Sequence, residues 1–268
     1  MAGAIAVALA TAGPASGGPV SYTGSFQLAQ GKYFFDQTMR GVFFINGFTV
    51  NAGAFTLSAS LPMIYQSSPY VSYSGVGVLP SGGTESSLVG NRQGKDPVIL
   101  PEPIEYRQFG VGDPMLFMGI RLWDEGKYRP SLQVQAQAKL PLATLESGFG
   151  TGEWDYGAGI SLSKKLGGVF LFADVGYWVL GDLPDLELAD PWSYVVSMGL
   201  PLSGGKAALM FSYSGFTEII SGVEPPSSLS LGLSLRVGPR SSLLLNGSLG
   251  LSESSPDFSA SFGWSIGL

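Results

Sequence analysis

The side chains available for chemistry in this chain are few, because the sequence contains neither histidine nor cysteine. Without histidine there is no general base for a serine-hydrolase arrangement, and the commonest metal ligand is missing. Without cysteine there can be no disulfide, thiolate metal site or cysteine nucleophile. The sequence therefore predicts a protein that is not an enzyme, has no catalytic residues, and holds no metal or cofactor.

Seven charged residues remain as candidates for contact with a solute, because each lies in a stripe of small polar residues that alternates with apolar ones. They are Arg40, Asp113, Arg121, Lys139, Asp155, Asp174 and Arg236. Two interpretations are open for them: a polar path that contacts a passing solute, or ion pairs that brace an enclosed interior, where charges need partners. The acids and bases nearly balance, so they predict no strong ion selectivity.

The stretches that carry these residues alternate with a period of two. Between 228 and 237, four leucines and Val237 alternate with serine, glycine and arginine, and from Phe258 to Leu268 large apolar residues alternate with serine and glycine. Because successive side chains of a strand point to opposite faces, each stretch predicts a strand with one apolar and one polar face. The stretch from Phe43 to Phe48 differs, since it is apolar on both faces.

The composition of the polar face indicates where these strands lie. Charged residues make up 13% of the chain, against roughly 25% in ordinary soluble proteins, and the polar face is mostly Ser, Gly and Gln. No apolar run approaches the ~18 residues of a spanning helix, and a closed barrel is the other structure that satisfies its backbone in lipid. The sequence predicts an all-β fold, a transmembrane antiparallel up-and-down β-barrel of about 12 strands in the bacterial outer membrane. A soluble β-sheet protein is the alternative.

Connections between the predicted strands alternate between short turns and longer loops. The longer ones cover about 67–108, 143–153, 181–191, 218–226 and 252–257. Beyond residue 140 these loops carry only acidic charges, whereas the short turns carry Lys164, Lys165, Lys206 and Arg240. We expect the short turns in the periplasm and the loops outside, as in other outer-membrane barrels. All five tryptophans lie near predicted strand ends, where aromatic girdles form.

The predicted organisation is a signal peptide at 1–17 followed by a single outer-membrane β-barrel domain at 18–268, with a long outer loop at 67–108. The N-terminal segment has the apolar core and small-residue exit of a signal peptide but no basic start. A truncated signal, a misplaced start codon or a simple apolar tail would each explain this. The long loop either folds into or over the barrel mouth or extends into solvent.

Three sequence motifs resemble a known family. They are GVGDP at 110–114, KLPLATLESGFGTGEWDYGAGISLSKKLGG at 139–168 and GYWVLGD at 176–182. Together they are similar to the outer-membrane transporters associated with the meta-pathway of phenol degradation, over about residues 75–265. The chain reads Pro141-Leu142-Ala143 where the family has Pro-Thr-Gly. The resemblance implies uptake of hydrophobic or aromatic compounds. The GFGTG segment is read as a glycine-rich bend, because no helix follows it as a phosphate loop requires.

The sequence thus favours an outer-membrane channel or transporter for small hydrophobic or aromatic solutes. The alternative is a structural or adhesive outer-membrane barrel with acidic surface loops, which bridges lipopolysaccharide through divalent cations. The expected partners are membrane lipid and lipopolysaccharide, a small-molecule solute, and the barrel-assembly machinery, which would read the last strand with Phe262, Trp264 and Leu268. A net charge of -6 argues against nucleic acid as a partner.

Overall fold

The structure of the protein is a computed structural model, described here for residues 19–33, 38–67, 71–80, 108–183 and 187–268. The signal peptide predicted at 1–17 lies outside these residues. Within the described residues no helix is long and apolar enough to cross a membrane.

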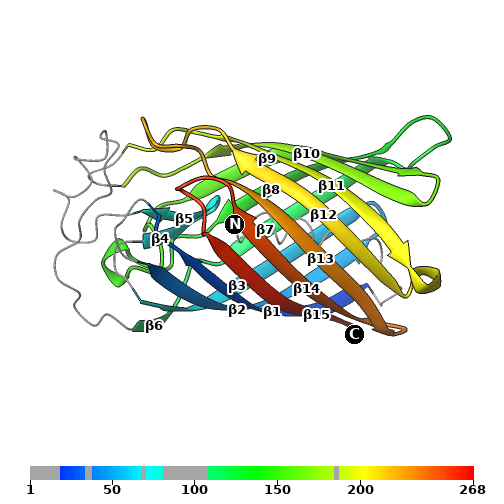
Figure 1. Cartoon of the computed structure of the whole chain (residues 1–268), viewed down its shortest axis with the longest axis horizontal. Coiled ribbons are helices and arrows are strands. Elements are labelled where there is room, and N and C mark those ends of the chain that lie inside the picture. Colours follow the sequence, from blue (N-terminus) through cyan, green and yellow to red (C-terminus); the bar gives the residue numbers. More distant parts are fainter. Residues whose placement is uncertain (1–18, 34–37, 68–70, 81–107, 184–186) are drawn as a thin grey trace.

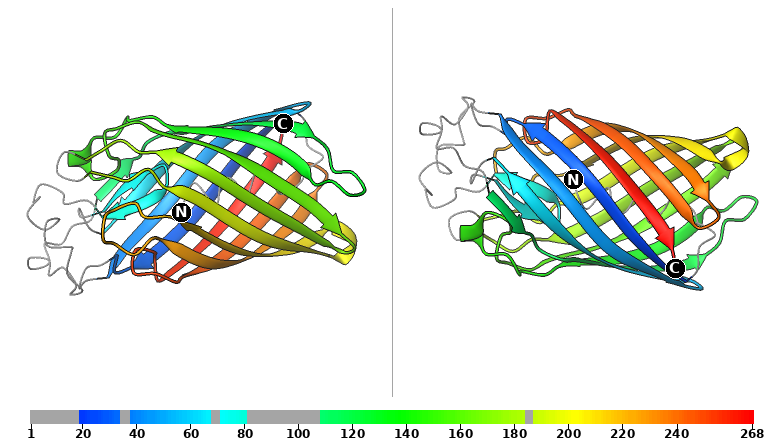
Figure 2. Two further views of the ribbon diagram at one scale, coloured as in Figure 1. Left: turned by 90° about the horizontal axis from the view of Figure 1, so that it is seen from above. Right: turned by 90° about the horizontal axis from the view of Figure 1, so that it is seen from below.

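The described residues form a closed antiparallel β-barrel (Figures 1 and 2). Its strands are β1 (Val20–Gly31), β2 (Met39–Ala52), β3 (Phe55–Gln66), β6 (Gln108–Val111), β7 (Met115–Trp123), β8 (Ser131–Lys139), β9 (Asp155–Leu166), β10 (Val169–Val179), β11 (Trp192–Leu202), β12 (Ala207–Phe216), β13 (Ser227–Gly238), β14 (Ser241–Gly250) and β15 (Phe258–Gly267). Both β6 and β7 pair with β3, so they act as one interrupted strand of the wall. Twelve wall strands result, and β1 closes the barrel by pairing with β15 as well as β2. The predicted fold class is confirmed.

The period-two pattern of the sequence corresponds to the two faces of this wall. On β13, Leu231 is 48% exposed on the outer face, whereas Ser228 is 2% exposed and faces the lumen. The outer face presents large apolar side chains around the barrel, as a lipid-facing surface requires. Asn46 is an exception on this face, and it accepts a hydrogen bond of 2.5 Å from the Tyr22 hydroxyl.

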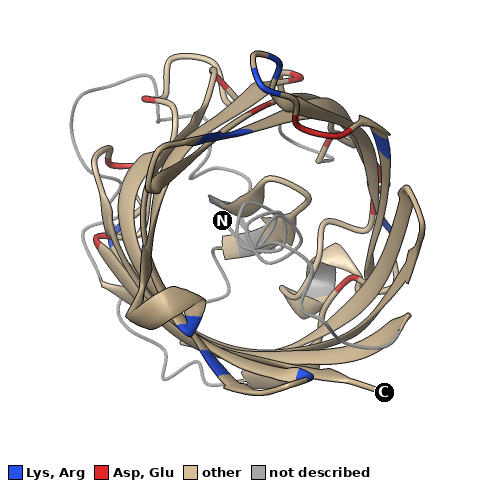
Figure 3. Ribbon diagram, turned by 90° about the vertical axis from the view of Figure 1, so that its right-hand side faces the viewer, with Lys and Arg blue, Asp and Glu red and all other residues tan. Residues whose placement is uncertain are grey.

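The two ends of the barrel differ in their connections. We call the end with the short connections at 124–130, 167–168, 203–206 and 239–240 the turn end, and the opposite end the loop end. Figure 3 views the barrel from the turn end. The described acids of the loops after residue 150 are exposed at the loop end, while Lys164, Lys165, Lys206 and Arg240 lie at the turn end. The predicted sorting of charge with loop length is present in the fold.

A small hairpin lies inside the barrel at the loop end (Figures 1 and 3). It consists of β4 (Val71–Ser74) and β5 (Gly77–Pro80), which pair with each other and not with the wall strands. The hairpin is part of the long loop predicted at 67–108, whose residues 68–70 and 81–107 lie outside the described ones. Residues 71–80 fold into the barrel, as the first of the two interpretations of this loop predicts.

The hairpin explains why β2 is apolar on both faces. Phe44 and Phe48 are on the outer face, where Phe44 stacks on Phe26 with ring centroids 4.5 Å apart. Phe43 and Ile45 are on the inner face, and Phe43 contacts Tyr73 of the hairpin edge-on at 4.9 Å. The inner face of β2 is therefore apolar because it supports the hairpin rather than a water-filled lumen.

Candidate functional site

A buried ion cluster lies at the loop end of the lumen. Lys139, the last residue of β8, places its Nζ 3.1 Å from Asp113 Oδ2 and 3.4 Å from Asp155 Oδ2, and it donates a hydrogen bond of 2.5 Å to Thr151 Oγ1. Lys139 is 1% exposed and Asp155 is fully buried. Because the ammonium is shared between two carboxylates, the rest of the negative charge has to be met by other donors.

Backbone N–H groups supply those donors. Asp113 Oδ1 accepts a hydrogen bond of 2.7 Å from the Ala143 N–H. Asp155 accepts from the Gly75 N–H at 2.6 Å and from the Gly181 N–H at 3.1 Å. Gly75 lies in the turn of the hairpin, and Ala143 and Gly181 lie in two of the loops. The cluster therefore ties the hairpin and two loops to the wall, as the bracing interpretation describes for these three charges.

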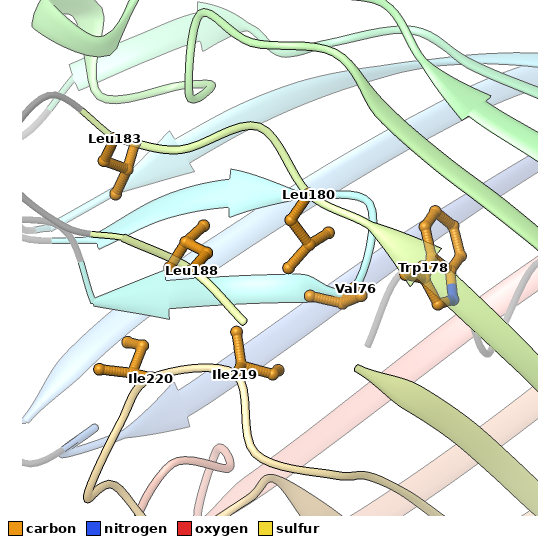
Figure 4. Close-up of a cluster of buried hydrophobic side chains, with 7 residues drawn as sticks. All are labelled: Val76, Trp178, Leu180, Leu183, Leu188, Ile219 and Ile220. Atoms are coloured by element: carbon orange, nitrogen blue, oxygen red, sulfur yellow. The ribbon is translucent and has the colours of Figure 1, made fainter. Parts of the chain in front are cut away.

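One side of the hairpin packs against a buried apolar cluster (Figure 4). The cluster consists of Val76, Trp178, Leu180, Leu183, Leu188, Ile219 and Ile220. A side chain at Gly75 would overlap the Trp178 ring, so only glycine lets the hairpin turn approach this closely. Trp178 is 4% exposed and lies inside the barrel. Its predicted place in an aromatic girdle is wrong, because it shares the lumen-facing parity of Asp174 on β10.

The other side of the hairpin packs against a second apolar cluster. Phe43, Ile64 and Phe149 are buried there, and Tyr73 of the hairpin lies against them. Phe149 reaches into the barrel from the 140–154 loop, and its ring covers Gly110, where a side chain would overlap it. The loop end of the lumen therefore contains a packed apolar core with the hairpin between its two parts.

A cavity adjoins the hairpin turn inside the barrel. Its volume is about 40 Å³, and its lining includes Gly75 of the hairpin together with residues of β8 to β12. Trp178 and Phe216 supply aromatic surface, while Gln137 and Asp174 supply polar atoms. This space has room for a few water molecules and is much smaller than small-molecule sites, which are roughly 300–1,000 Å³.

Asp174 is the charged residue of this cavity. It is 8% exposed and accepts a hydrogen bond from Ser161 Oγ. Among the described residues no lysine or arginine forms a salt bridge with it, in contrast to Asp113 and Asp155. The bracing interpretation therefore does not extend to Asp174, which lines the small cavity and has no cation partner among the described residues.

The remaining three predicted residues lie near the two rims. Arg40 is exposed at the loop end, where its Nε donates to Gln30 Oε1 at 3.1 Å. Its predicted place in the lumen is wrong, because it shares the outward parity of Phe44 and Phe48 on β2. Arg121 is at the turn end, 3.2 Å from Asp124, and Arg236 is exposed at the same end on β13. The structure thus brings together Asp113, Lys139 and Asp155 but not the arginines.

Sequence reasoning missed Thr151 and the hairpin. The sequence does contain a signal for Thr151, because it lies in the 139–168 motif. All four members of the buried ion cluster fall in this motif or in GVGDP. The hairpin had none that separates it from a surface loop, since its strands have four residues each. Within the described part of the chain, no group of three or more acidic residues could hold a metal ion.

A twelve-stranded barrel with an apolar outer belt, short turns at one end and loops at the other is a bacterial outer-membrane β-barrel, and its outer belt contacts membrane lipid. The fold is similar to that of an outer-membrane channel from Pseudomonas putida F1, with a TM-score of 0.64 and 13% identity over 95% of this chain and 96% of that chain. It is also similar to the KdgM porin, with a TM-score of 0.51 and 5% identity over 92% and 99% of the two chains. The CymD monoaromatic hydrocarbon channel gives a TM-score of 0.50 and 9% identity over 94% and 89%.

The sequence places the chain more specifically. The profile of the family described as "Putative MetA-pathway of phenol degradation" matches residues 41–267. The chain belongs to this family, which confirms the resemblance seen in its motifs. Comparison with the curated proteins gives no match.

Proposed function

We propose that the protein is an outer-membrane channel for small hydrophobic or aromatic solutes. The observation that carries this proposal is the closed twelve-stranded barrel, whose lumen contains a small cavity with Trp178 and Phe216 in its lining. Aromatic side chains offer flat apolar surface that a ring solute can contact face to face or edge to face. Family membership and the described substrate of the similar CymD channel support the same class of solute.

In this proposal the resistance to a passing solute differs along the barrel. A solute that enters from the loop end meets the hairpin first, because the hairpin occupies the lumen between two apolar clusters. Below it, the solute reaches the cavity and then a lumen lined by hydroxyl groups, such as the Ser131–Ser163 pair. Displacement of the hairpin is therefore the slow step of passage, and the wall itself stays closed.

The experiment is uptake by cells whose own aromatic-solute channels have been deleted. Cells expressing the protein should accumulate radiolabelled toluene or phenol from micromolar solution severalfold faster than cells carrying an empty vector. The matched control is a similarly expressed eight-stranded barrel, whose interior is filled by side chains. Equal uptake with both barrels would contradict the channel and favour the structural alternative.

The structural alternative has one observation in its favour, the exposed acidic residues of the loop end. Glu153, Asp182, Glu187 and Asp190 are all exposed there, where divalent cations could bridge them to lipopolysaccharide. We include lipopolysaccharide contact in the proposal as a partner interaction compatible with transport. Recognition of β15 by the assembly machinery, and the absence of enzymatic activity inferred from the missing histidine, belong to the proposal as well.

A further inference from the structure

The connection between β7 and β8, residues 124–130, is the longest of the short connections at the turn end and stands clear of the wall (green in Figures 1 and 2). Hydrogen bonds hold it in one shape. The Gly126 N–H donates to the Arg129 carbonyl oxygen at 3.0 Å, and Trp123 Nε1 donates to the Pro130 carbonyl oxygen at 3.0 Å. The residues at its tip are therefore presented on a preorganised turn, which lowers the entropy cost of binding a ligand.

Lys164 of the neighbouring strand β9 anchors this turn. Its Nζ donates to the carbonyl oxygens of Gly126 at 2.5 Å and Lys127 at 3.1 Å, and it lies 3.1 Å from Glu125 Oε1. Lys164 has the same parity on β9 as Ile160, which is 45% exposed on the outer face. Because side chains of one parity share a face, the turn is fixed to the lipid-facing side of the wall and not to the lumen.

Two positive charges at the tip of the turn have no acidic partner within the described part of the chain. Lys127 and Arg129 are both exposed, and neither forms a salt bridge there. The acids of the same turn, Asp124 and Glu125, pair instead with basic residues of the wall strands. Although the whole chain has a net charge of -6, this point of its surface is locally positive and attracts an anion.

The residue between these two cations is Tyr128, whose side chain is 87% exposed. The Lys127 Nζ lies 5.3 Å from the centre of its ring. Leu122 and Trp123, the last residues of β7, are also exposed and lead from the apolar outer belt into the turn. An aromatic ring with a polar tip at the boundary between an apolar belt and water is typical of the headgroup level of a bilayer. The turn therefore combines positive charge with a surface suited to lipid.

We propose that residues 127–129 form a binding site for the headgroup of an anionic phospholipid such as phosphatidylglycerol. Lys127 and Arg129 bind the phosphate through charge-assisted hydrogen bonds, while Tyr128 lies against the glycerol and the upper acyl chains. The orientation expected from the sequence puts this end of the barrel in the periplasm, so the lipid belongs to the periplasmic leaflet. A free phosphate would use the two cations but leave Tyr128 and the neighbouring apolar belt uncovered. The site lies outside the barrel, so it does not depend on the proposed channel function.

The test measures lipid binding to the full chain in a neutral detergent by native mass spectrometry. The two probes are dioleoyl phosphatidylglycerol and dioleoyl phosphatidylcholine, which have the same acyl chains but differ in net charge. Wild-type protein should bind the first phosphatidylglycerol about thirtyfold more tightly than phosphatidylcholine, as two basic residues near a membrane surface predict. Lys127→Gln combined with Arg129→Gln should remove most of this preference.

The matched control is Lys206→Gln combined with Arg240→Gln. It removes the same charge from the turn end, but from turns that contain no aromatic residue. This variant should keep the wild-type preference, and heat-modifiable migration on gels should show that both double variants fold. An equal loss of preference in the two double variants would mean that net charge alone attracts the lipid, which would overturn the proposal.

Two further outcomes overturn the proposal without any variant. One is equal binding of the two lipids by wild-type protein. The other is loss of phosphatidylglycerol binding in inorganic phosphate but not in sodium chloride of the same ionic strength, which would show a site for the free anion. A preference for phosphatidylglycerol that survives inorganic phosphate, is lost in the 127/129 variant and is kept in the 206/240 variant supports the proposed lipid site.

Discussion

The loop end of the lumen and the rim of the turn end contain lysine–carboxylate pairs of the same length in different surroundings. Lys139 Nζ is 3.1 Å from Asp113 Oδ2 at the loop end, and both side chains are 2% exposed. Lys164 Nζ is 3.1 Å from Glu125 Oε1 at the turn end, where the side chains are 18% and 35% exposed. Distance alone does not rank the two pairs, because burial sets the cost of leaving one partner without the other.

The largest effect should come from removing the shared cation. Lys139→Met leaves Asp113 and Asp155 without it in a buried site, so we expect a loss of about 3–5 kcal/mol in the free energy of unfolding. Lys164→Met is the matched change at the turn end and should cost at most about 1 kcal/mol. Urea unfolding in lipid vesicles, followed by tryptophan fluorescence, measures both. Equal losses would mean that burial does not decide how much stability each lysine–carboxylate pair contributes.

The next effect separates the outer face of the wall from the turn-end lumen. Leu231→Arg puts a charge against lipid near the middle of β13, which should cost about 2–4 kcal/mol. Ser234→Arg, three residues nearer the turn end and facing the lumen, should cost less because the side chain reaches water. The same unfolding measurement compares the pair. A greater loss in Ser234→Arg would show that this half of the lumen is packed rather than hydrated.

The third prediction concerns passage rather than stability. Val76 is buried in the apolar cluster that holds the hairpin turn, and Val76→Asp introduces a charge there. The hairpin can leave the cluster without unfolding the wall, because β4 and β5 pair only with each other among the described strands. We expect single-channel conductance to rise severalfold, with normal heat-modifiable migration. Wild-type conductance in the folded variant would mean that the hairpin does not limit passage.

The smallest effect is a pH dependence at the turn end. The Lys165 N–H hydrogen bond, followed by Lys164, lowers the pKa of Glu125 below its ordinary value of 4.5. A carboxyl group with a lowered pKa in the folded state stabilises the fold above its unfolded pKa, and this contribution is lost as the pH falls through the folded pKa. Glu125→Gln should therefore be slightly less stable than wild type at pH 7, and the difference should disappear as the pH is lowered through and below 4.5. A difference that grows in acid would contradict the assignment.

The strands and their two faces could be predicted from the sequence, because a residue's parity along a strand decides which face it occupies. Leu231 and Ser228 are on the faces that the alternation predicts. The same rule also places Trp178 in the lumen with Asp174. The prediction that Trp178 belongs to an aromatic girdle was wrong because it considered only the distance to the strand end and not the parity. Period, turn chemistry and composition were enough to predict the closed barrel, since only a closed sheet satisfies its backbone in lipid.

The tertiary structure decides how far along the barrel axis each lumen residue lies. It also decides which residues each one meets across the barrel. Arg121 and Lys139 both face inward, yet one pairs with Asp124 at the rim and the other joins a buried cluster. Strand stagger and loop paths set these positions, and neither appears in a local pattern. The hairpin is the clearest case, because four-residue strands have too little periodicity to show that they enter the lumen. Its place depends on apolar surface supplied by Phe43, Trp178 and other residues distant in sequence, which meet only when the barrel closes.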